Sequence, residues 1–173
     1  MIPPHLTYLV TLFLLFLLPQ AVHGFRNITV DSQNPAIVYS PQAGWSNATI
    51  GDVNPGRVCM VTTTPNGTAT FSFTGLLSVI ILRLRRSSCC SGVAIYFLAP
   101  LWPYERSSGL MLDAGPIVRF DLTDHSHVTG TPGGPATVKS EVIASAVGLG
   151  NTLHTVQVSV AEGQSCSVFD RFM

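Results

Sequence analysis

Short stretches in which hydrophobic and polar residues alternate recur along the chain, with turn residues between them. The clearest is residues 68–74, TATFSFT, where alanine and phenylalanine alternate with threonine and serine. Alternation with a period of two places one set of side chains on each face of a β-strand. Residues 154–160 repeat the pattern with valines. Both stretches therefore predict strands with one face in a hydrophobic core.

Further segments of strand length lie between turn residues. They are residues 28–30, 36–39, 57–62, 76–84, 93–98, 110–112, 117–122 and 167–172. Residues 110–122 read as a hairpin with its turn after Asp113, residues 130–135 (GTPGGP) as a loop, and residues 138–145 fit either a strand or a short helical turn. A set of roughly eight to ten short strands predicts an all-β fold, a two-sheet antiparallel β-sandwich of jelly-roll type.

The run at residues 93–98 is apolar throughout, which is typical of a strand buried on both faces. Pro100 and Pro103 follow it and cannot donate a hydrogen bond to a neighbouring strand. LWPY at residues 101–104 is therefore predicted to be the exit loop of that strand.

The first residues differ from the rest of the chain. Residues 6–18, LTYLVTLFLLFLL, form an apolar run too short to cross a bilayer and of the right length for the core of a signal peptide. Small residues before Gly24 predict cleavage there, which leaves residues 25–173 as the mature β-sandwich domain. No Lys or Arg precedes the run, so an uncleaved segment that anchors the protein at the cell surface is the alternative.

The sequons agree with export, and the charge balance limits the classes of partner. Lys and Arg number 9 against 9 Asp and Glu, with a formal net charge of +0, which argues against nucleic acid and anionic lipid as partners. A membrane partner is expected only if the N-terminal segment stays uncleaved or the chain is a truncated gene model. Three sequons predict N-glycosylation. They begin at Asn27, Asn47 and Asn66.

Four cysteines form an even set: Cys59, Cys89, Cys90 and Cys166. In an oxidising compartment such a set predicts disulfides. A bridge between the neighbours Cys89 and Cys90 would close a small strained ring, so the favoured pairing joins Cys59 and Cys166 each to one member of that pair. The other pairings stay open. No CxxC motif is present, which argues against a zinc site.

Several motifs resemble the uncharacterised extracellular domains of basidiomycete fungi. The most specific are the LWPY run, the LD-x-GP pattern at residues 112–116 and the N-x-x-HTV pattern at residues 151–156. The resemblance covers about residues 26 to 172 and implies a galactose-binding-like β-sandwich without an established activity. Such domains usually continue into a Ser/Thr-rich stalk and one transmembrane helix. This chain stops at Met173 and carries Arg119 where an apolar residue is more usual, so a short secreted member or a truncated gene model is expected.

Three patterns resemble fragments of catalytic or metal sites. GWSNA at residues 44–48 comes close to the GxSxG motif but lacks the strand and helix that the motif requires on either side. His125 and His127 share one side of an extended segment, as in cupin metal sites, but no Glu follows at the cupin spacing. Asp31 favours an Asx turn, while a structural calcium at this residue stays open. We therefore predict no catalytic residue and no required cofactor, with a cupin-like or hydrolytic enzyme as the least favoured alternative.

Aromatic residues after the apolar strand are the candidate ligand site. Pyranose faces stack on Trp and Tyr while polar neighbours bind the hydroxyls. Trp102 and Tyr104, with Glu105 and Arg106 as polar partners, form the candidate glycan platform, and Trp45 is a more distant candidate. The favoured alternative is that LWPY folds back over one end of the sandwich and buries Trp102.

The sequence thus predicts a secreted, non-catalytic β-sandwich domain that binds carbohydrate at the cell surface. The alternative is a structural ectodomain of a truncated single-pass membrane protein with no ligand of its own. The position of Trp102 distinguishes the two: an exposed ring supports binding at the platform, and a buried ring supports the structural role.

Overall fold

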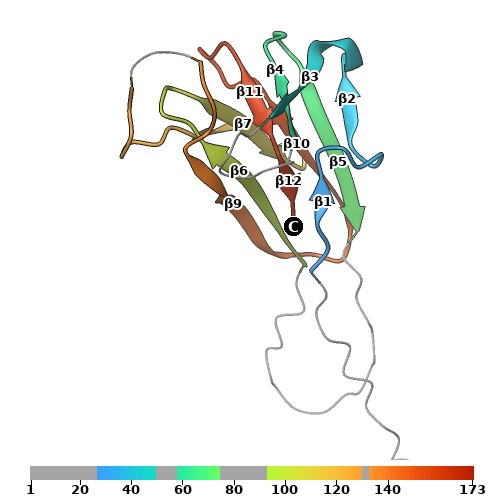
Figure 1. Ribbon diagram of the computed structural model, residues 1–173. Helices are drawn as coiled ribbons and strands as arrows, with labels where there is room; N and C mark the ends of the chain where they lie inside the picture. The colour runs from blue at the N-terminus through green and yellow to red at the C-terminus, as the bar shows by residue number, and fades with distance from the viewer. Residues whose placement is uncertain (1–26, 50–57, 75–92, 130–132) are drawn as a thin grey trace, which may run out of the picture.

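The computed structural model describes residues 27–49, 58–74, 93–129 and 133–173 (Figure 1). Within these residues the chain forms strands and one 3₁₀ helix: β1 (Val30–Asp31), β2 (Val38–Ser40), η1 (Gln42–Gly44), β3 (Trp45–Thr49), β4 (Val58–Thr62), β5 (Thr68–Thr74), β6 (Val93–Leu101), β7 (Ser107–Leu112), β8 (Val118–Asp121), β9 (Val138–Leu149), β10 (Leu153–Ser159), β11 (Ser167–Phe169) and β12 (Arg171–Phe172). The predicted signal peptide, the predicted strand at 76–84 and both Cys89 and Cys90 lie outside the described residues. No helix among the described residues has the length and apolar character needed to cross a bilayer.

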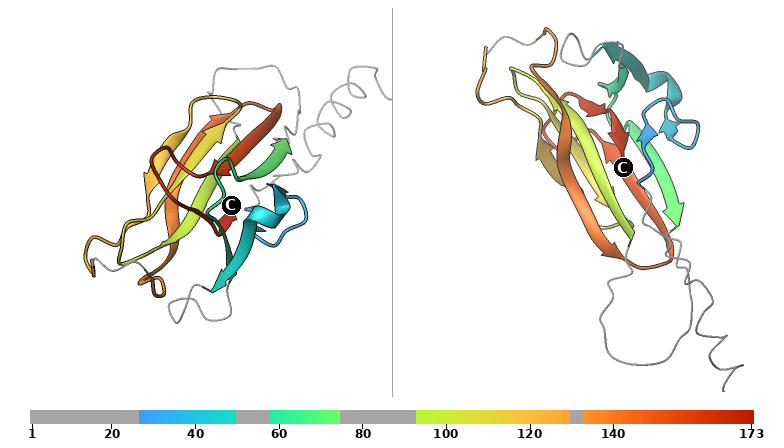
Figure 2. Two further views of the ribbon diagram at one scale, coloured as in Figure 1. Left: turned by 90° about the horizontal axis from the view of Figure 1, so that it is seen from above. Right: turned by 60° about the horizontal axis from the view of Figure 1, so that its bottom comes forward.

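The strands pair antiparallel in three sheets that form two layers. The five-stranded sheet has the order β2-β5-β10-β7-β8, and the four-stranded sheet has the order β1-β12-β6-β9. A three-stranded sheet, β11-β4-β3, continues the second layer, since only Asp170 separates β11 from β12. Figure 2 shows the layers from two further sides. The predicted all-β, two-sheet antiparallel sandwich is confirmed.

Aromatic rings from both layers meet in the core. Phe97 of β6 lies 6.4 Å from Phe169 and 6.1 Å from Phe172, measured between ring centroids. Phe71 of β5 stacks on Phe172 at 5.9 Å across the gap between the layers. Phe71 comes from the alternating run that predicted β5, and the bounds of β5 match that prediction. Burial of this cluster stabilises the packing of the two layers.

The apolar strand is longer than predicted because a proline lies inside it. β6 continues through Pro100 to Leu101. Ala99 pairs with Glu141 and Leu101 with Val138, and the register shifts between these two pairs. A bulge is one of the few places where a strand accepts a residue without an N–H donor. The predicted end of the strand before Pro100 was therefore wrong.

Two other elements differ from the sequence predictions. Residues 138–149 form a twelve-residue strand, β9, which settles the ambiguity between strand and helical turn. β3 was not predicted at all, because WSNAT carries a sequon and no alternating apolar residues. It forms because Ser46 and Asn47 pair with Val61 and Met60 of β4.

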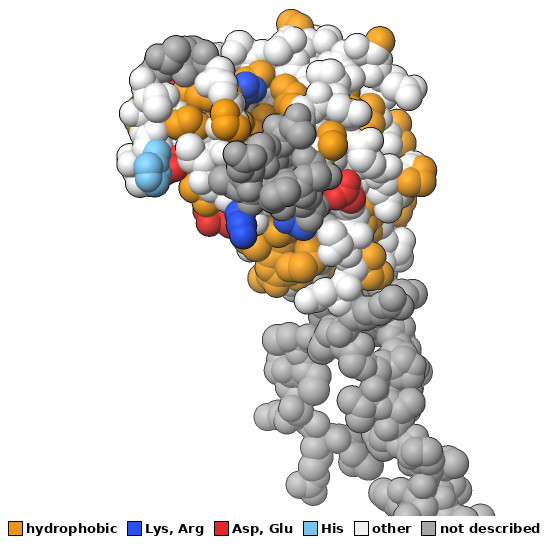
Figure 3. All heavy atoms as spheres, in the orientation of Figure 1, with side chains coloured by type: hydrophobic (Ala, Val, Ile, Leu, Met, Phe, Trp, Pro, Cys, Tyr) orange, Lys and Arg blue, Asp and Glu red, His pale blue; other side chains and the backbone are white. Residues whose placement is uncertain are grey.

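Charged side chains are few and of both signs on the face shown in Figure 3, in keeping with the composition.

Candidate functional site

The aromatic residues of LWPY are buried. Trp102 is 5% exposed and Tyr104 is 6% exposed. The Trp102 backbone N donates to Leu122 O at 2.9 Å, and Trp102 forms an isolated parallel bridge with Thr123. The loop therefore folds back over the sandwich, which confirms the favoured alternative. The glycan platform predicted on these two rings gains no support from this geometry, because neither ring has a free face on which a sugar could stack.

The two polar partners predicted for that platform support the fold instead. The Arg106 guanidinium carbon lies 5.7 Å from the Trp102 ring centroid and 5.1 Å from that of Tyr104. Its Nη2 donates to Tyr104 Oη at 3.2 Å. Glu105 is exposed and forms an ion pair with Arg119 of the edge strand β8 at 3.1 Å. Arg119, unexpected in an apolar position, is therefore solvated and paired.

The two histidines of the predicted cupin fragment bind different carboxylates. His125 Nε2 lies 2.9 Å from Asp121 Oδ2, and His127 Nδ1 lies 2.8 Å from Asp124 Oδ2. Asp124 is buried, and hydrogen bonds led by those from the Ser126 and Thr137 hydroxyls hold its pKa well below the usual range. Within the described ranges, no group of three or more His, Cys, Asp or Glu side chains could hold a metal ion.

The fragment that resembles GxSxG also has no catalytic geometry. Ser46 lies inside β3 and not at a strand-to-helix turn. Its Oγ donates to Val61 O of the neighbouring strand at 3.5 Å. The sequon residues Asn27, Asn47 and Asn66 are all exposed, and their glycosylation stays a prediction.

Cys59 and Cys166 are not in a disulfide within the described part of the chain. Cys59 is fully buried, its Sγ donates to Ala48 O at 3.4 Å, and burial raises the pKa of the thiol to about 12. Cys166 Sγ accepts a hydrogen bond from Arg106 Nη1 at 3.0 Å. Because Cys89 and Cys90 lie outside the described residues, the predicted bridges stay a prediction.

A polar groove of about 470 Å³ lies where the turn between β1 and β2 meets η1, β3 and β4. Polar side chains and two aromatic rings share its lining. These residues are Ser32, Gln33, Asn34, Pro35, Ile37, Tyr39, Gln42, Trp45 and Met60. Of them, only Trp45 was a candidate from the sequence, and only as a distant one.

The turn that forms one wall of the groove is held by its own side chains. Asp31 Oδ1 accepts a hydrogen bond from Gln33 N at 3.1 Å, which confirms the predicted Asx turn. Asn34 Oδ1 accepts from Ala36 N at 2.9 Å in a second turn of the same kind. The wall is therefore preorganised, and the side chains of Gln33 and Asn34 are carried on a fixed backbone.

Tyr39 and Trp45 bring aromatic rings into the groove. Their ring centroids are 5.1 Å apart with the planes tilted by 55°. The Tyr39 hydroxyl donates to Ser32 O at 2.6 Å. Burial, and secondarily the charge of Asp31, raises the pKa of Tyr39 well above its usual range, so the phenol stays protonated.

The indole of Trp45 carries the least satisfied polar group of the groove. Trp45 is 6% exposed, and its buried Nε1–H has no hydrogen-bond partner among the described residues. A buried donor without an acceptor costs about 1–3 kcal/mol, and native structures contain few of them. A bound hydroxyl or carbonyl oxygen that reached this N–H would remove the cost.

Amide side chains supply the remaining chemistry. Gln33 Nε2 donates to Asn47 Oδ1 at 3.2 Å, while Gln42 is exposed on η1. Each amide offers two N–H donors and a carbonyl acceptor. The groove therefore offers donors and acceptors to a neutral, hydroxyl-rich molecule.

No protein-family model matches the chain, and no curated protein matches its sequence. Among solved structures, the chain is similar to the Podospora anserina GH26-CBM35 β-(1,4)-mannanase, with 11% identity over 84% of this chain and a TM-score of 0.49. Two structures of an exo-β-1,3-galactanase from Phanerochaete chrysosporium with β-1,3-galactotriose are similar at 15% identity, over 84% and 86% of this chain, with TM-scores of 0.47 and 0.48. This chain spans 26%, 28% and 29% of those three chains. At TM-scores below 0.5 these likenesses assign neither a family nor a function.

Proposed function

We propose that this chain is an exported, non-catalytic β-sandwich domain that binds carbohydrate in the polar groove at Tyr39 and Trp45. One observation carries the proposal: Trp45, whose buried indole N–H has no partner among the described residues, lines a groove that also has three side-chain amides, those of Gln33, Asn34 and Gln42. Sugar hydroxyls both donate and accept hydrogen bonds, so they match this set. The groove replaces the LWPY platform as the proposed site.

Recognition in this groove depends on hydrogen bonds more than on ring stacking. Trp45 is too deeply buried to offer its face to a pyranose. Its buried N–H can donate to a hydroxyl oxygen only after the side chains that cover it move, whereas the exposed amide of Gln42 can bind a hydroxyl directly. Because the wall of the groove is already fixed by its two Asx turns, little conformational entropy is lost on binding.

A glycan array with the secreted protein tests the proposal. We expect the wild type to bind, and Gln42→Ala to bind about threefold to tenfold more weakly, since one hydrogen bond is lost. Gln164→Ala is the matched control, because this glutamine lies outside the groove and contacts Glu105 at 3.4 Å. Absence of glycan binding by the wild type would overturn the proposal, and equal loss in both variants would overturn the site.

A second variant isolates the indole donor. Trp45→Phe keeps an aromatic ring but removes the N–H, so we expect weaker glycan binding with an unchanged β-sheet circular dichroism spectrum. Undiminished binding by this variant would show that the indole N–H takes no part.

The second candidate function is a structural ectodomain without a ligand. The burial of Trp102 and Tyr104 favours it, because the rings most suited to an exposed platform are used in packing. This alternative predicts that the wild-type protein is folded and secreted but binds no glycan on the array.

A further inference from the structure

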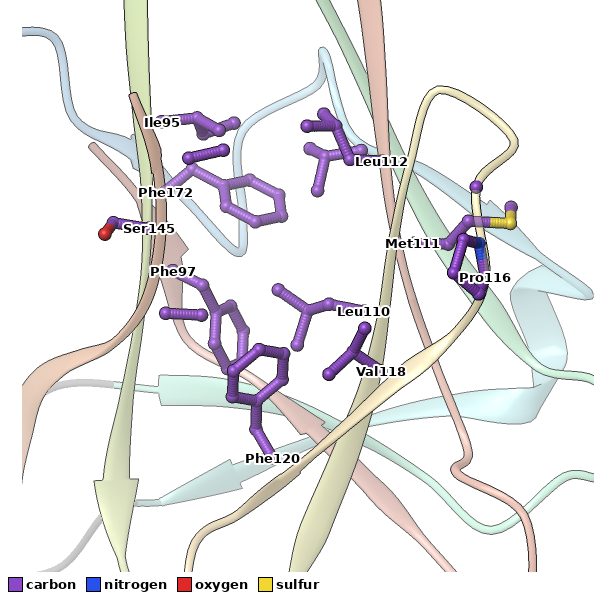
Figure 4. A pocket seen from close by; sticks show the side chains of 14 residues that line it. Ile95, Phe97, Leu110, Met111, Leu112, Pro116, Val118, Phe120, Ser145 and Phe172 are labelled. Carbon is purple, nitrogen blue, oxygen red and sulfur yellow. The ribbon is translucent and has the colours of Figure 1, made fainter. Parts of the chain in front are cut away.

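A second cavity lies between the two layers of the sandwich and shares no lining residue with the groove. Its volume is about 280 Å³, and it is open to solvent. Side chains of β6, β9 and β12 line one wall, and those of β7, β8 and β10 line the facing wall (Figure 4). Since it is built independently of the groove, its ligand does not depend on the proposed function.

The lining of this cavity is almost entirely hydrocarbon. Phe97 and Phe172 face Leu110 and Leu112 across the gap. None of the lining residues is charged, and Ser145 is the only one with a side-chain hydroxyl. Figure 4 shows that hydroxyl pointing away from the facing wall. A polar or charged group of a ligand would therefore lose its hydration inside without a partner.

The cavity lies beside the two edge strands of the sandwich. β8 is the edge of the five-stranded sheet and β9 is the edge of the four-stranded sheet. Val118 of β8 lines the cavity and is 49% exposed. A ligand can therefore place an apolar part between the layers while another part of it stays in water.

We propose that this cavity binds the hydrocarbon chain of an amphiphile, a medium-chain acyl group whose polar end remains in solvent. The volume of the cavity limits the length of the acyl chain. A cavity of about 150 Å³ holds one benzene molecule, so this one has room for an apolar group of about ten to twelve carbons. The apolar lining selects hydrocarbon, and the solvent-exposed opening accommodates the polar end.

A chain-length series with the full-length wild-type protein tests the proposal. Straight-chain alkanoates of about six to sixteen carbons are titrated below their micelle concentrations and followed by the methyl NMR signal of Met111, which lines the cavity. Affinity should rise about threefold to fourfold per methylene and then level off at about ten to twelve carbons. Absence of binding, or a rise that never levels off, overturns the proposal.

Two variants locate the site. Ala146→Leu adds carbon atoms inside the cavity and should weaken dodecanoate binding by about tenfold or more. Val147→Leu is the control, because Val147 is 66% exposed on the same strand and does not line the cavity. Equal affinity in all three proteins overturns the proposal. If Ala146→Leu fails to fold, the wild-type length series alone decides.

A second copy of the chain is the competing occupant of this apolar edge. Size-exclusion chromatography across a concentration series measures whether the protein dimerises. A monomer that binds dodecanoate supports the proposal, whereas a dimer that dodecanoate neither binds nor dissociates overturns it.

Discussion

His154 Nδ1 lies 2.7 Å from Asp113 Oδ2, and this contact joins β10 to the turn between β7 and β8. His154 Nε2 lies 2.9 Å from Gly150 O. The Asp113 carboxylate and the Gly150 carbonyl only accept hydrogen bonds, so the imidazolium form, with a donor on each ring nitrogen, satisfies both, while the Thr152 hydroxyl lies farther from Nε2 at 3.4 Å. The other carboxylate oxygen of Asp113 accepts from Thr155 N at 2.8 Å.

This pair makes stability depend on pH. The hydrogen bond from His154 lowers the pKa of Asp113 below its usual 3.8, and the same bond raises the pKa of His154 above its usual 6.5. The contribution of His154 to the free energy of unfolding is therefore complete below about pH 6.5, and it is lost as pH rises through the raised pKa. The Asp113 contribution is present above about pH 3.8 and is lost as pH falls through the lowered pKa.

We expect the urea midpoint to be higher at about pH 5.5 than at about pH 8.5. Asp113→Asn should flatten this dependence, since it removes the negative charge opposite His154. Asparagine also tolerates the positive φ of 50° at this position. A variant that keeps the full pH dependence of the wild type would contradict the assignment to this pair.

Arg106 should matter for stability far more than Arg119. Its guanidinium contacts the rings of Trp102 and Tyr104 and donates to Cys166 Sγ. We expect Arg106→Ala to lower the free energy of unfolding by about 1–3 kcal/mol. Arg119→Ala, which removes only an exposed ion pair with Glu105, should lower it by about 0.5 kcal/mol or less. Equal effects in urea denaturation would show that the ring contacts contribute nothing.

The cysteine prediction is tested by peptide mapping without reduction. If Cys59 is bridged to Cys89 or Cys90, reduction should destabilise the protein by about 3–4 kcal/mol, because a loop of tens of residues is opened. If Cys59 is instead free, its burial and raised pKa should leave it unreactive toward iodoacetamide until the protein unfolds. Four free thiols would end the disulfide hypothesis.

Export and glycosylation are tested by the intact mass of secreted protein before and after enzymatic deglycosylation. We expect a mass without residues 1–24 and a loss of mass on deglycosylation. The exposed positions of Asn27, Asn47 and Asn66 leave each amide accessible to the transferase. Retention of the first residues would favour the anchored alternative, and an unchanged mass would exclude glycans at all three sites.

Local patterns predicted the strands well where apolar and polar residues alternate along them. The alternation of TATFSFT determines both faces of β5, and Asp31 formed its expected turn. β3 was missed because its strand conformation comes from pairing with β4 and not from its own residues.

The candidate site was harder to predict for the same reason. Whether LWPY folds back depends on the bridge between Trp102 and Thr123. The groove forms only when the turn after Asp31, the helix η1 and the strand β4 come together. Contacts between segments far apart in sequence leave no local period from which they could be inferred.

The pairing of β1 with β12, near the two ends of the described chain, has a consequence for the order of folding. β1 pairs with β12, and β12 in turn pairs with β6. During synthesis the first strand therefore leaves the ribosome long before the strand on which it must dock. Such pairing between distant segments is slow, and strands that are still unpaired are prone to aggregate. The four-stranded sheet can close only after translation has passed Phe172, which makes its assembly a late event in the biogenesis of the domain.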